Sequence, residues 1–273
     1  MAGASFEAQN QNAPRRLNNG NLTNGQWSTL YNMFSFGLIS MLACTVYTLV
    51  SQARVLPKYR NALVISSMVT FIAAYHYFRI FNSFNESTMD GGVTVGTAKG
   101  TFNEAYRYVD WILTVPLLLV EVIAVLALAK AAASSLIGRL VPASAAMIAL
   151  GYPGEISAVT NTKVLFGVLS TIPFLYILYV LFVELGKSLE RQPEGVAATV
   201  GRLRLLLVAT WGVYPISYLL PILSDTSATD PGAFVNRQIG YTMADVLAKC
   251  VFGITIMKIA RLKSAAEGMK EDH

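Results

Sequence analysis

The stretch WSTLYNMFSFGLISMLACTVYTLVS, residues 27–51, contains no Asp, Glu, Lys or Arg. The hydrocarbon core of a bilayer is about 30 Å thick, and a helix that crosses it needs roughly 20 consecutive apolar residues. Further apolar runs follow at residues 61–83, 105–129, 140–156, 164–183, 203–223 and 239–261. The pattern therefore predicts an all-α fold, a bundle of seven transmembrane helices.

The overall composition agrees with a membrane protein. The chain is 54% hydrophobic and 14% charged, whereas about a quarter of the residues of a soluble domain are charged. Most of its 21 Lys and Arg residues lie beside the loops after the first, third and fifth runs, or after the seventh. Cytoplasmic loops collect positive charge, so we expect the N-terminus outside and the C-terminus in the cytoplasm. The net charge of +5 then reflects membrane topology, and no nucleic-acid partner is expected.

The runs also suggest the domain organisation. Residues 1–26 are polar and lack the apolar core of a cleavable signal, which predicts an extracellular N-terminal segment. Residues 27–262 form one membrane domain, and residues 263–273 a cytoplasmic tail. Between the second and third runs, Asp-Gly-Gly at 90–92 followed by the alternating Val93 and Val95 predicts a small extracellular hairpin.

Several ionisable residues interrupt the apolar runs. A charge at the centre of a spanning helix costs roughly 2.5–3.5 kcal/mol on insertion scales, so each needs a partner or a function. Asp245 and Lys249 are four residues apart in the seventh run and therefore lie on one helix face, where they can pair. His76 lies in the second run, at about the depth expected for the acidic residue of the third.

The third run carries a second polar face. Arg107, Asp110 and Thr114 are spaced three and four residues apart, which places them together on a helix. Glu121 returns to nearly the same face about three turns, or roughly 16 Å, further along. One buried ion pair can serve packing alone, but ionisable groups at several depths favour an ion pathway.

Four motifs resemble those of microbial (type 1) rhodopsins, and the likeness covers the chain from about residue 27 to residue 261. YRYVDWILTVPLLLVE, residues 106–121, is similar to their third helix, and LSTIPFLYILYVLF, residues 169–182, to their fifth. WGVYPISY, residues 211–218, resembles the sixth helix, and DVLAK, residues 245–249, the seventh. Within that family the chain most resembles the proteorhodopsin group, in particular the xanthorhodopsin-like light-driven proton pumps.

The resemblance implies a multi-pass protein of a prokaryotic plasma membrane, a transporter and not an enzyme. Lys249 would carry all-trans retinal as a Schiff base, with Asp110 and Asp245 as counterions. Asp110 would then accept the proton and Glu121 return one from the cytoplasm, while Arg107 would hold the outer network. No metal is expected.

Further roles are implied for neighbouring side chains. Thr114 would form a hydrogen bond near the proton acceptor, and His76 would pair with that acceptor, as in proteorhodopsins. Leu118 resembles the position that tunes colour in proteorhodopsins, and its apolar side chain implies green absorption. The retinal-contacting residues would be Trp111, Leu118, Trp211, Tyr214 and Tyr218.

Gly167 raises the possibility of a second pigment. Many rhodopsins have Trp at this position, whereas xanthorhodopsin-like members have Gly, which would open a window for a carotenoid (xanthophyll) antenna. Gly is also common in membrane helices, so ordinary packing is the alternative.

Three functions remain open from the sequence. The first is outward proton pumping, favoured over pumping of another ion because residues 110, 114 and 121 match neither the sodium-pump nor the chloride-pump pattern. The second is a sensory rhodopsin that signals through a partner, and the third a retinal-free transporter or receptor. Protons and membrane lipids are the expected partners, and the resemblance suggests a homo-oligomer, a pentamer or a trimer.

Overall fold

The first helix begins where the sequence supplies a strong N-terminal cap. Thr23 accepts a hydrogen bond from the backbone of Gln26, and the Gln26 side chain accepts one from the backbone of Thr23, which forms a capping box. From there α2 runs over Asn24–Val50. The computed structural model describes residues 15–17, 20–88, 102–103, 105–157, 159–190, 192–223 and 231–269.

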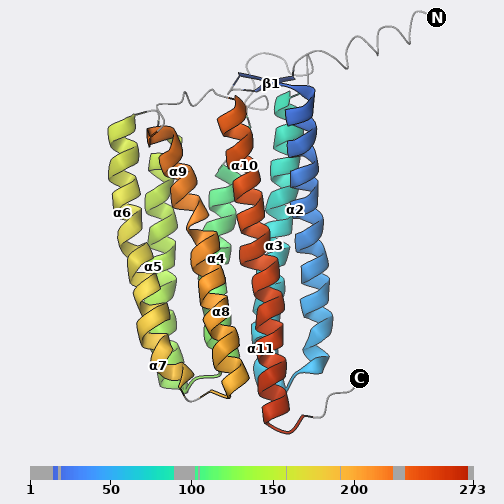
Figure 1. Cartoon of the computed structure of the whole chain (residues 1–273), viewed down its shortest axis with the longest axis vertical. Helices are drawn as coiled ribbons and strands as arrows, with labels where there is room; N and C mark the ends of the chain where they lie inside the picture. Colours follow the sequence, from blue (N-terminus) through green and yellow to red (C-terminus); the bar gives the residue numbers. More distant parts are fainter. Residues whose placement is uncertain are drawn as a thin grey trace, which may run out of the picture.

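Within these residues the helices form seven rods that lie along one axis (Figure 1). The rods are α2; α3 (Pro57–Thr88); α4 (Ala105–Leu126); α5 (Lys130–Ile156); α6 (Thr160–Tyr179) with η3 (Val180–Glu184) and α7 (Leu185–Leu189); α8 (Glu194–Trp211) with α9 (Val213–Leu223); and α10 (Pro231–Val246) with η4 (Leu247–Val251) and α11 (Phe252–Ala266). A short 3-10 helix, η1 (Ser51–Arg54), follows α2. The prediction of a seven-helix bundle is confirmed.

The rods form a closed ring. Helices α2, α3, α4, α5 and α6 pack in sequence order, and the fifth rod meets the sixth where α7 contacts α8. The last rod closes the ring by packing against α2, α3 and α8. Strands β1 (Arg15–Leu17) and β2 (Gly20–Leu22) pair antiparallel at one end, which we call the strand end. The other end, where α11 finishes, is the tail end (Figure 1).

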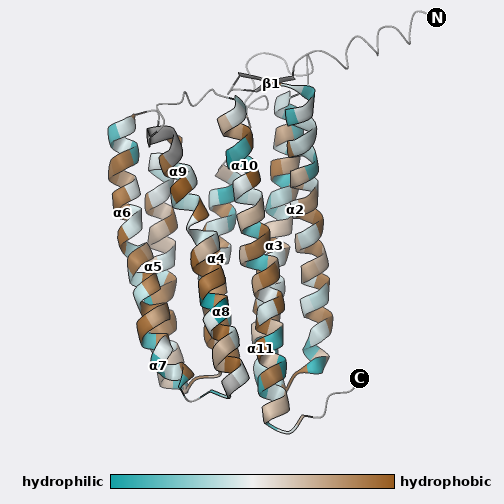
Figure 2. Cartoon of the chain, in the orientation of Figure 1, coloured by the Kyte–Doolittle hydropathy of each residue, from teal (hydrophilic) through white to brown (hydrophobic). Residues whose placement is uncertain are grey.

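Six of the rods are long and apolar enough to cross a membrane by length and composition, as judged over the described residues. The last rod contains the polar residues Gln238, Asp245 and Lys249. All three side chains are buried inside the ring. Apolar residues recur along α5, α6 and α8, and polar ones are most frequent near the two ends (Figure 2).

Several helices extend beyond the apolar runs predicted from the sequence. The fourth rod begins at Lys130 and not near residue 140, the sixth at Glu194 and not near residue 203, and the last at Pro231 and not near residue 239. At the tail end, α11 continues to Ala266, past the predicted domain boundary at residue 262. The two N-terminal strands were not predicted, and the predicted hairpin at residues 90–95 lies outside the described residues.

Two rods contain π-helical segments, η3 and η4. A π-bulge widens one turn and leaves backbone groups without their usual partners, and such bulges often mark functional positions. Lys249 lies in the middle of η4.

Candidate functional site

Lys249 lies inside the bundle with its ammonium held between two carboxylates. Its side chain is 2% exposed, and its Nζ lies 2.6 Å from Oδ1 of Asp245 and 3.0 Å from Oδ2 of Asp110. The pairing with Asp245 follows the four-residue spacing within the last rod, as predicted, whereas Asp110 comes from α4. Such an arrangement neutralises one buried cation with a pair of acids.

The carboxylate of Asp245 is fully partnered. Besides Lys249, it accepts hydrogen bonds from the hydroxyls of Tyr77 and Tyr214 at 2.9 and 2.8 Å, and from Trp111 Nε1 at 3.2 Å. Arg107 adds an ion pair at 3.2 Å. A carboxylate offers about four acceptor positions, so Asp245 has no free one. Its negative charge is therefore strongly stabilised.

Asp110 is partnered on one side only. Its Oδ2 faces Lys249, but its Oδ1 is buried and has no hydrogen-bond partner among the residues that the structure describes. His76 Nδ1 lies 3.9 Å from that oxygen, as the depth argument predicted, although the same nitrogen is 2.9 Å from the Ile72 carbonyl. Thr114 donates to the backbone carbonyl of Asp110 at 2.9 Å and not to its carboxylate.

Arg107 connects this centre to a second group of polar side chains, which were not predicted from the sequence. Its guanidinium donates to Gln238 Oε1 at 2.9 Å and to the hydroxyl of Tyr77 at 3.2 Å, and Thr242 is 3.5 Å away. Gln238 and Thr242 precede Asp245 by seven and three residues, so helical spacing could have identified them. Tyr77 directly follows His76, and no pattern pointed to its hydroxyl.

Glu121 lies away from this network, toward the tail end. It is fully buried, and neither carboxylate oxygen has a hydrogen-bond partner among the described residues. The structure thus separates Glu121 from Lys249 and its acids, as the eleven-residue offset from Asp110 along α4 implied.

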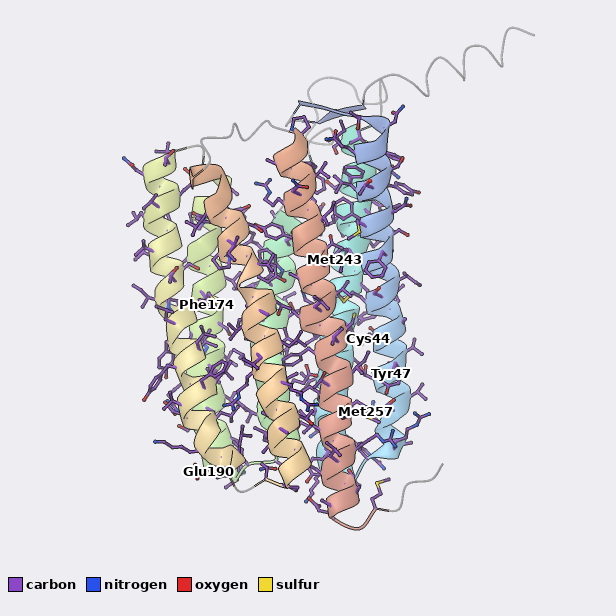
Figure 3. All side chains as sticks on the ribbon, in the orientation of Figure 1. Cys44, Tyr47, Phe174, Glu190, Met243 and Met257 are labelled. Carbon is purple, nitrogen blue, oxygen red and sulfur yellow. The ribbon has the colours of Figure 1, made fainter. Side chains whose placement is uncertain are left out.

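A cavity of about 530 Å³ extends from Lys249 toward α5 and α6. Every side chain predicted to contact a chromophore lines it: Trp111, Leu118, Gly167, Trp211, Tyr214, Tyr218 and Lys249. An elongated apolar cavity of this size, with flat aromatic walls and one amine, suits a conjugated apolar ligand. Phe174 on α6 is another lining residue and is labelled in the side-chain view (Figure 3). The same view labels Cys44 on α2, which does not line the cavity.

The cavity reaches the lipid-facing side of α6 near Gly167. Its wall there includes Val164, Val168 and Ile172, which are between 47% and 62% exposed. A Cβ atom on Gly167 would lie 3.0 Å from the ring of Tyr218, so the ring occupies the space that the glycine leaves. The hydroxyl of Tyr218 donates to the Lys163 carbonyl at 2.6 Å, which fixes this ring at the edge of the cavity.

These features define a class of protein. A buried lysine, paired with two acids at the closed end of an aromatic cavity in a seven-helix membrane bundle, is the site of a chromophore-binding membrane protein. Residues 28–262 match the family model described as bacteriorhodopsin-like protein. The chain belongs to this family and is a microbial rhodopsin of the proteorhodopsin and xanthorhodopsin type.

Individual relatives agree with this assignment. The chain is 30% identical over 238 residues to the green-light absorbing proteorhodopsin of a gamma-proteobacterium, covering 86% of this chain and 88% of the relative. The crystal structure of xanthorhodopsin, described as a light-driven ion pump with dual chromophore, is 47% identical with a TM-score of 0.83, covering 91% and 98% of the two chains. A thermophilic rhodopsin is 42% identical, also with a TM-score of 0.83, covering 94% and 99%.

Family membership establishes the general activity. The chain is a multi-pass protein of a prokaryotic membrane and a light-driven proton pump, a transporter and not an enzyme. Members of the family bind retinal through a lysine. The residues found here fit that cofactor, because Lys249 is the amine that opens into the cavity and its positive charge is already balanced by two acids.

Proposed function

We propose that the protein pumps protons outward, with Asp110 accepting a proton from the Lys249 nitrogen and Glu121 returning one from the cytoplasmic side. The observation that carries the proposal is the unequal partnering of the two acids. Asp245 accepts contacts from five side chains, whereas Asp110 Oδ1 has no hydrogen-bond partner in the described part of the chain. An acid whose charge is less stabilised takes up a proton more easily.

The direction of transport rests on topology. Positive charge gathers beside the tail-end loops, which supports a cytoplasmic tail end and an extracellular strand end. Arg107 and Asp110 then lie on the extracellular side of Glu121. We assign residues 1–26 to an extracellular segment, 27–262 to the retinal-binding domain and 263–273 to the cytoplasmic tail.

The cavity walls would hold the cofactor. Retinal bound to Lys249 supplies a protonated imine and a double bond that light isomerises. Trp111, Trp211 and Tyr214 pack against the cavity and exclude water from it, which preserves the strength of the ion pairs around Lys249. We assign His76 the role of pairing with Asp110, whose Oδ1 lies 3.9 Å from its Nδ1. Leu118 provides an apolar wall, for which we expect green absorption.

The test is illumination of cells that express wild type, Asp110→Asn or Glu121→Gln after addition of all-trans retinal. Wild type should acidify the suspension in light, and a protonophore should abolish the signal. Asp110→Asn should form pigment but move no protons, and Glu121→Gln should slow the return of the Lys249 proton. Coloured wild-type cells without any pH change would support a sensory function instead and overturn the proposal.

A carotenoid antenna is the second part of the proposed function. The cavity wall beside Gly167 reaches the lipid-facing surface of α6, and the xanthorhodopsin structure is described as having a dual chromophore. A xanthophyll lying there would contact Tyr218 and pass excitation to retinal.

Addition of xanthophylls to purified pigment tests the antenna. We expect structured blue absorption that excites the retinal pigment, and its loss in Gly167→Trp. Gly138→Trp is the matched control, since a Cβ atom on Gly138 meets nothing within 4 Å. Absence of energy transfer for every xanthophyll tried would remove the antenna from the function.

We also propose a homo-oligomer, a pentamer or a trimer, as the likeness to the proteorhodopsin group suggests. The mass of the pigment in lipid nanodiscs measures its oligomeric state. A monomer under all lipid conditions would contradict this assignment.

A further inference from the structure

Lys263 is a buried lysine outside the site described above. It lies in the last turn of α11 and is 6% exposed. Its Nζ donates to the backbone carbonyl of Leu126 at 2.5 Å. An ammonium group is rarely buried without a specific contact, because removing it from water is costly.

The accepting carbonyl belongs to the last residue of α4. The final carbonyls of an α-helix have no partner within the helix, and here the chain turns away at Ala127, whose φ is 48°. A cation near this end also interacts favourably with the helix dipole. Lys263 thus caps α4 from a neighbouring rod.

A third helix joins the same contact. The ammonium of Lys263 lies 5.1 Å from the centre of the Tyr59 ring, near the start of α3. The hydroxyl of Tyr59 donates to Glu267, which also pairs with Lys58. We call Tyr59, Lys263 and Glu267, together with the Leu126 carbonyl, the tail-end latch. It ties α3, α4 and α11 at one point.

The latch lies over Glu121. Leu126 follows Glu121 by five residues on α4, which corresponds to about 7.5 Å along the helix axis. The side chains of Val125 and Leu126 are fully buried and belong to the same core cluster as Ile256 and Ala260 of α11. A proton needs water or polar groups to move through a protein. This packed apolar region must therefore loosen before the Glu121 carboxylate can be reprotonated from the tail end.

We propose that Lys263 is a positioning residue that holds the tail end of α4 closed over Glu121 and thereby limits the rate of proton uptake from that side. The inference rests on the proposed function, in which Glu121 is the group that is reprotonated from the cytoplasmic side. Release of the Lys263 contact frees the end of α4, and water then reaches Glu121. Restoring the contact closes the path again.

The test compares Lys263→Met with Lys258→Met. Methionine keeps the unbranched chain of lysine as far as Cε and removes the ammonium. Lys258 is an exposed lysine on the same helix. Amide hydrogen exchange in the dark, over the last two turns of α4, should be faster by roughly tenfold in Lys263→Met, which corresponds to about 1.4 kcal/mol. Lys258→Met and Lys263→Arg should exchange as wild type does.

A pH-sensitive dye in the medium gives the second readout. After a flash, Lys263→Met should take up its proton several-fold faster than wild type, while the earlier proton transfer to Asp110 keeps its rate. The proposed role of the latch would be overturned if Lys263→Met changed neither the amide hydrogen exchange of α4 nor the rate of proton uptake. It would also be overturned if Lys258→Met had the same effects as Lys263→Met. Should Lys263→Met form no pigment, Tyr59→Leu serves instead, because it removes the ring beneath the ammonium and the link to Glu267.

The two proposals fail in different ways. Wild-type pigment that takes up no proton in light overturns the proposed function, whatever the exchange data show. Normal wild-type uptake together with wild-type behaviour of Lys263→Met overturns the latch alone.

Discussion

At the residue scale, the environment of each acid determines its task. Asp110 and Asp245 both face Lys249 at 2.6–3.0 Å, and both are buried. Tyr77, Arg107, Trp111 and Tyr214 all direct their polar hydrogens at Asp245. In the proposed function, the same residue type would therefore serve as a permanent counterion at position 245 and as the proton acceptor at position 110.

This difference predicts unequal effects of the two Asp→Asn substitutions on stability. Asp245→Asn removes the ion pair that the buried guanidinium of Arg107 makes with Asp245, and breaking a buried pair costs about 3–5 kcal/mol. Asp110→Asn removes fewer contacts and should cost less. The midpoints of denaturant-induced unfolding measure the difference in stability between the two variants. Equal midpoints would contradict the unequal roles of the two acids.

At the element scale, π-helical segments are stabilised by side chains from neighbouring rods. Arg204 on α8 donates to the Leu181 carbonyl in η3 at 3.0 Å, and its guanidinium lies 5.2 Å from the centre of the Phe182 ring. Similarly, the Cys44 thiol of α2 lies 3.6 Å from the Cys250 carbonyl in η4. Each contact adds an interhelical donor to a carbonyl of the irregular turn.

Loss of the Arg204 contact should therefore destabilise the bundle. Arg204→Met leaves the buried carbonyl of Leu181 without this donor, which costs about 1–3 kcal/mol. Arg202→Met, at an exposed position on the same helix, is the control and should have little effect. The rate of thermal bleaching of the pigment measures the stability of both variants. Similar bleaching rates would show that Arg204 makes no special contribution to stability.

Close packing of α2 against α3 gives another prediction at this scale. A Cβ atom on Gly37 would lie 2.5 Å from the ring of Tyr77, whose hydroxyl donates to Asp245. Gly37→Ala should thus cost about 1–3 kcal/mol through overpacking and shift the absorption maximum by moving that hydroxyl. Gly138→Ala, in open space, should do neither. A wild-type spectrum of Gly37→Ala would mean that the Tyr77 contact is not coupled to the pigment.

At the scale of the whole molecule, the two ends of the bundle differ in charge and so determine its orientation in the membrane. Cysteines introduced at opposite ends can test this. Glu190, at the tail end in Figure 3, and Thr160, at the start of α6, are both exposed. An impermeant maleimide should label Thr160→Cys in intact cells and Glu190→Cys only after the cells are opened, and the reverse pattern would invert the direction of pumping.

The tail end also gives a pH dependence. The Lys58 ammonium and the Tyr59 hydroxyl hold the pKa of the Glu267 carboxyl below its ordinary value. A group with a lowered pKa stabilises the folded state above its unfolded pKa and loses that effect as the pH falls through the folded value. Thermal stability should therefore decrease slightly below about pH 4, and Glu267→Gln should remove this step. An unchanged acid profile in that variant would show that Glu267 is not its source.

The sequence by itself determined the architecture and the principal polar residues. Apolar runs of bilayer length predicted the seven rods, because the membrane leaves backbone groups few ways to form hydrogen bonds. Helical spacing predicted the pair of Asp245 and Lys249, and the motif in the third run identified Asp110 and Glu121. These relations lie within single helices, where the positions of residues follow from the 3.6-residue turn.

Only the tertiary structure decided which groups meet across helices. The convergence of Tyr77, Arg107 and Trp111 on Asp245, the contact of Asp110 with Lys249, and the contact of Lys263 with the end of α4 each join residues from different rods. Such contacts depend on the rotation and height of every helix relative to its neighbours. Packing of the whole ring sets those quantities, and no local pattern in the sequence encodes them.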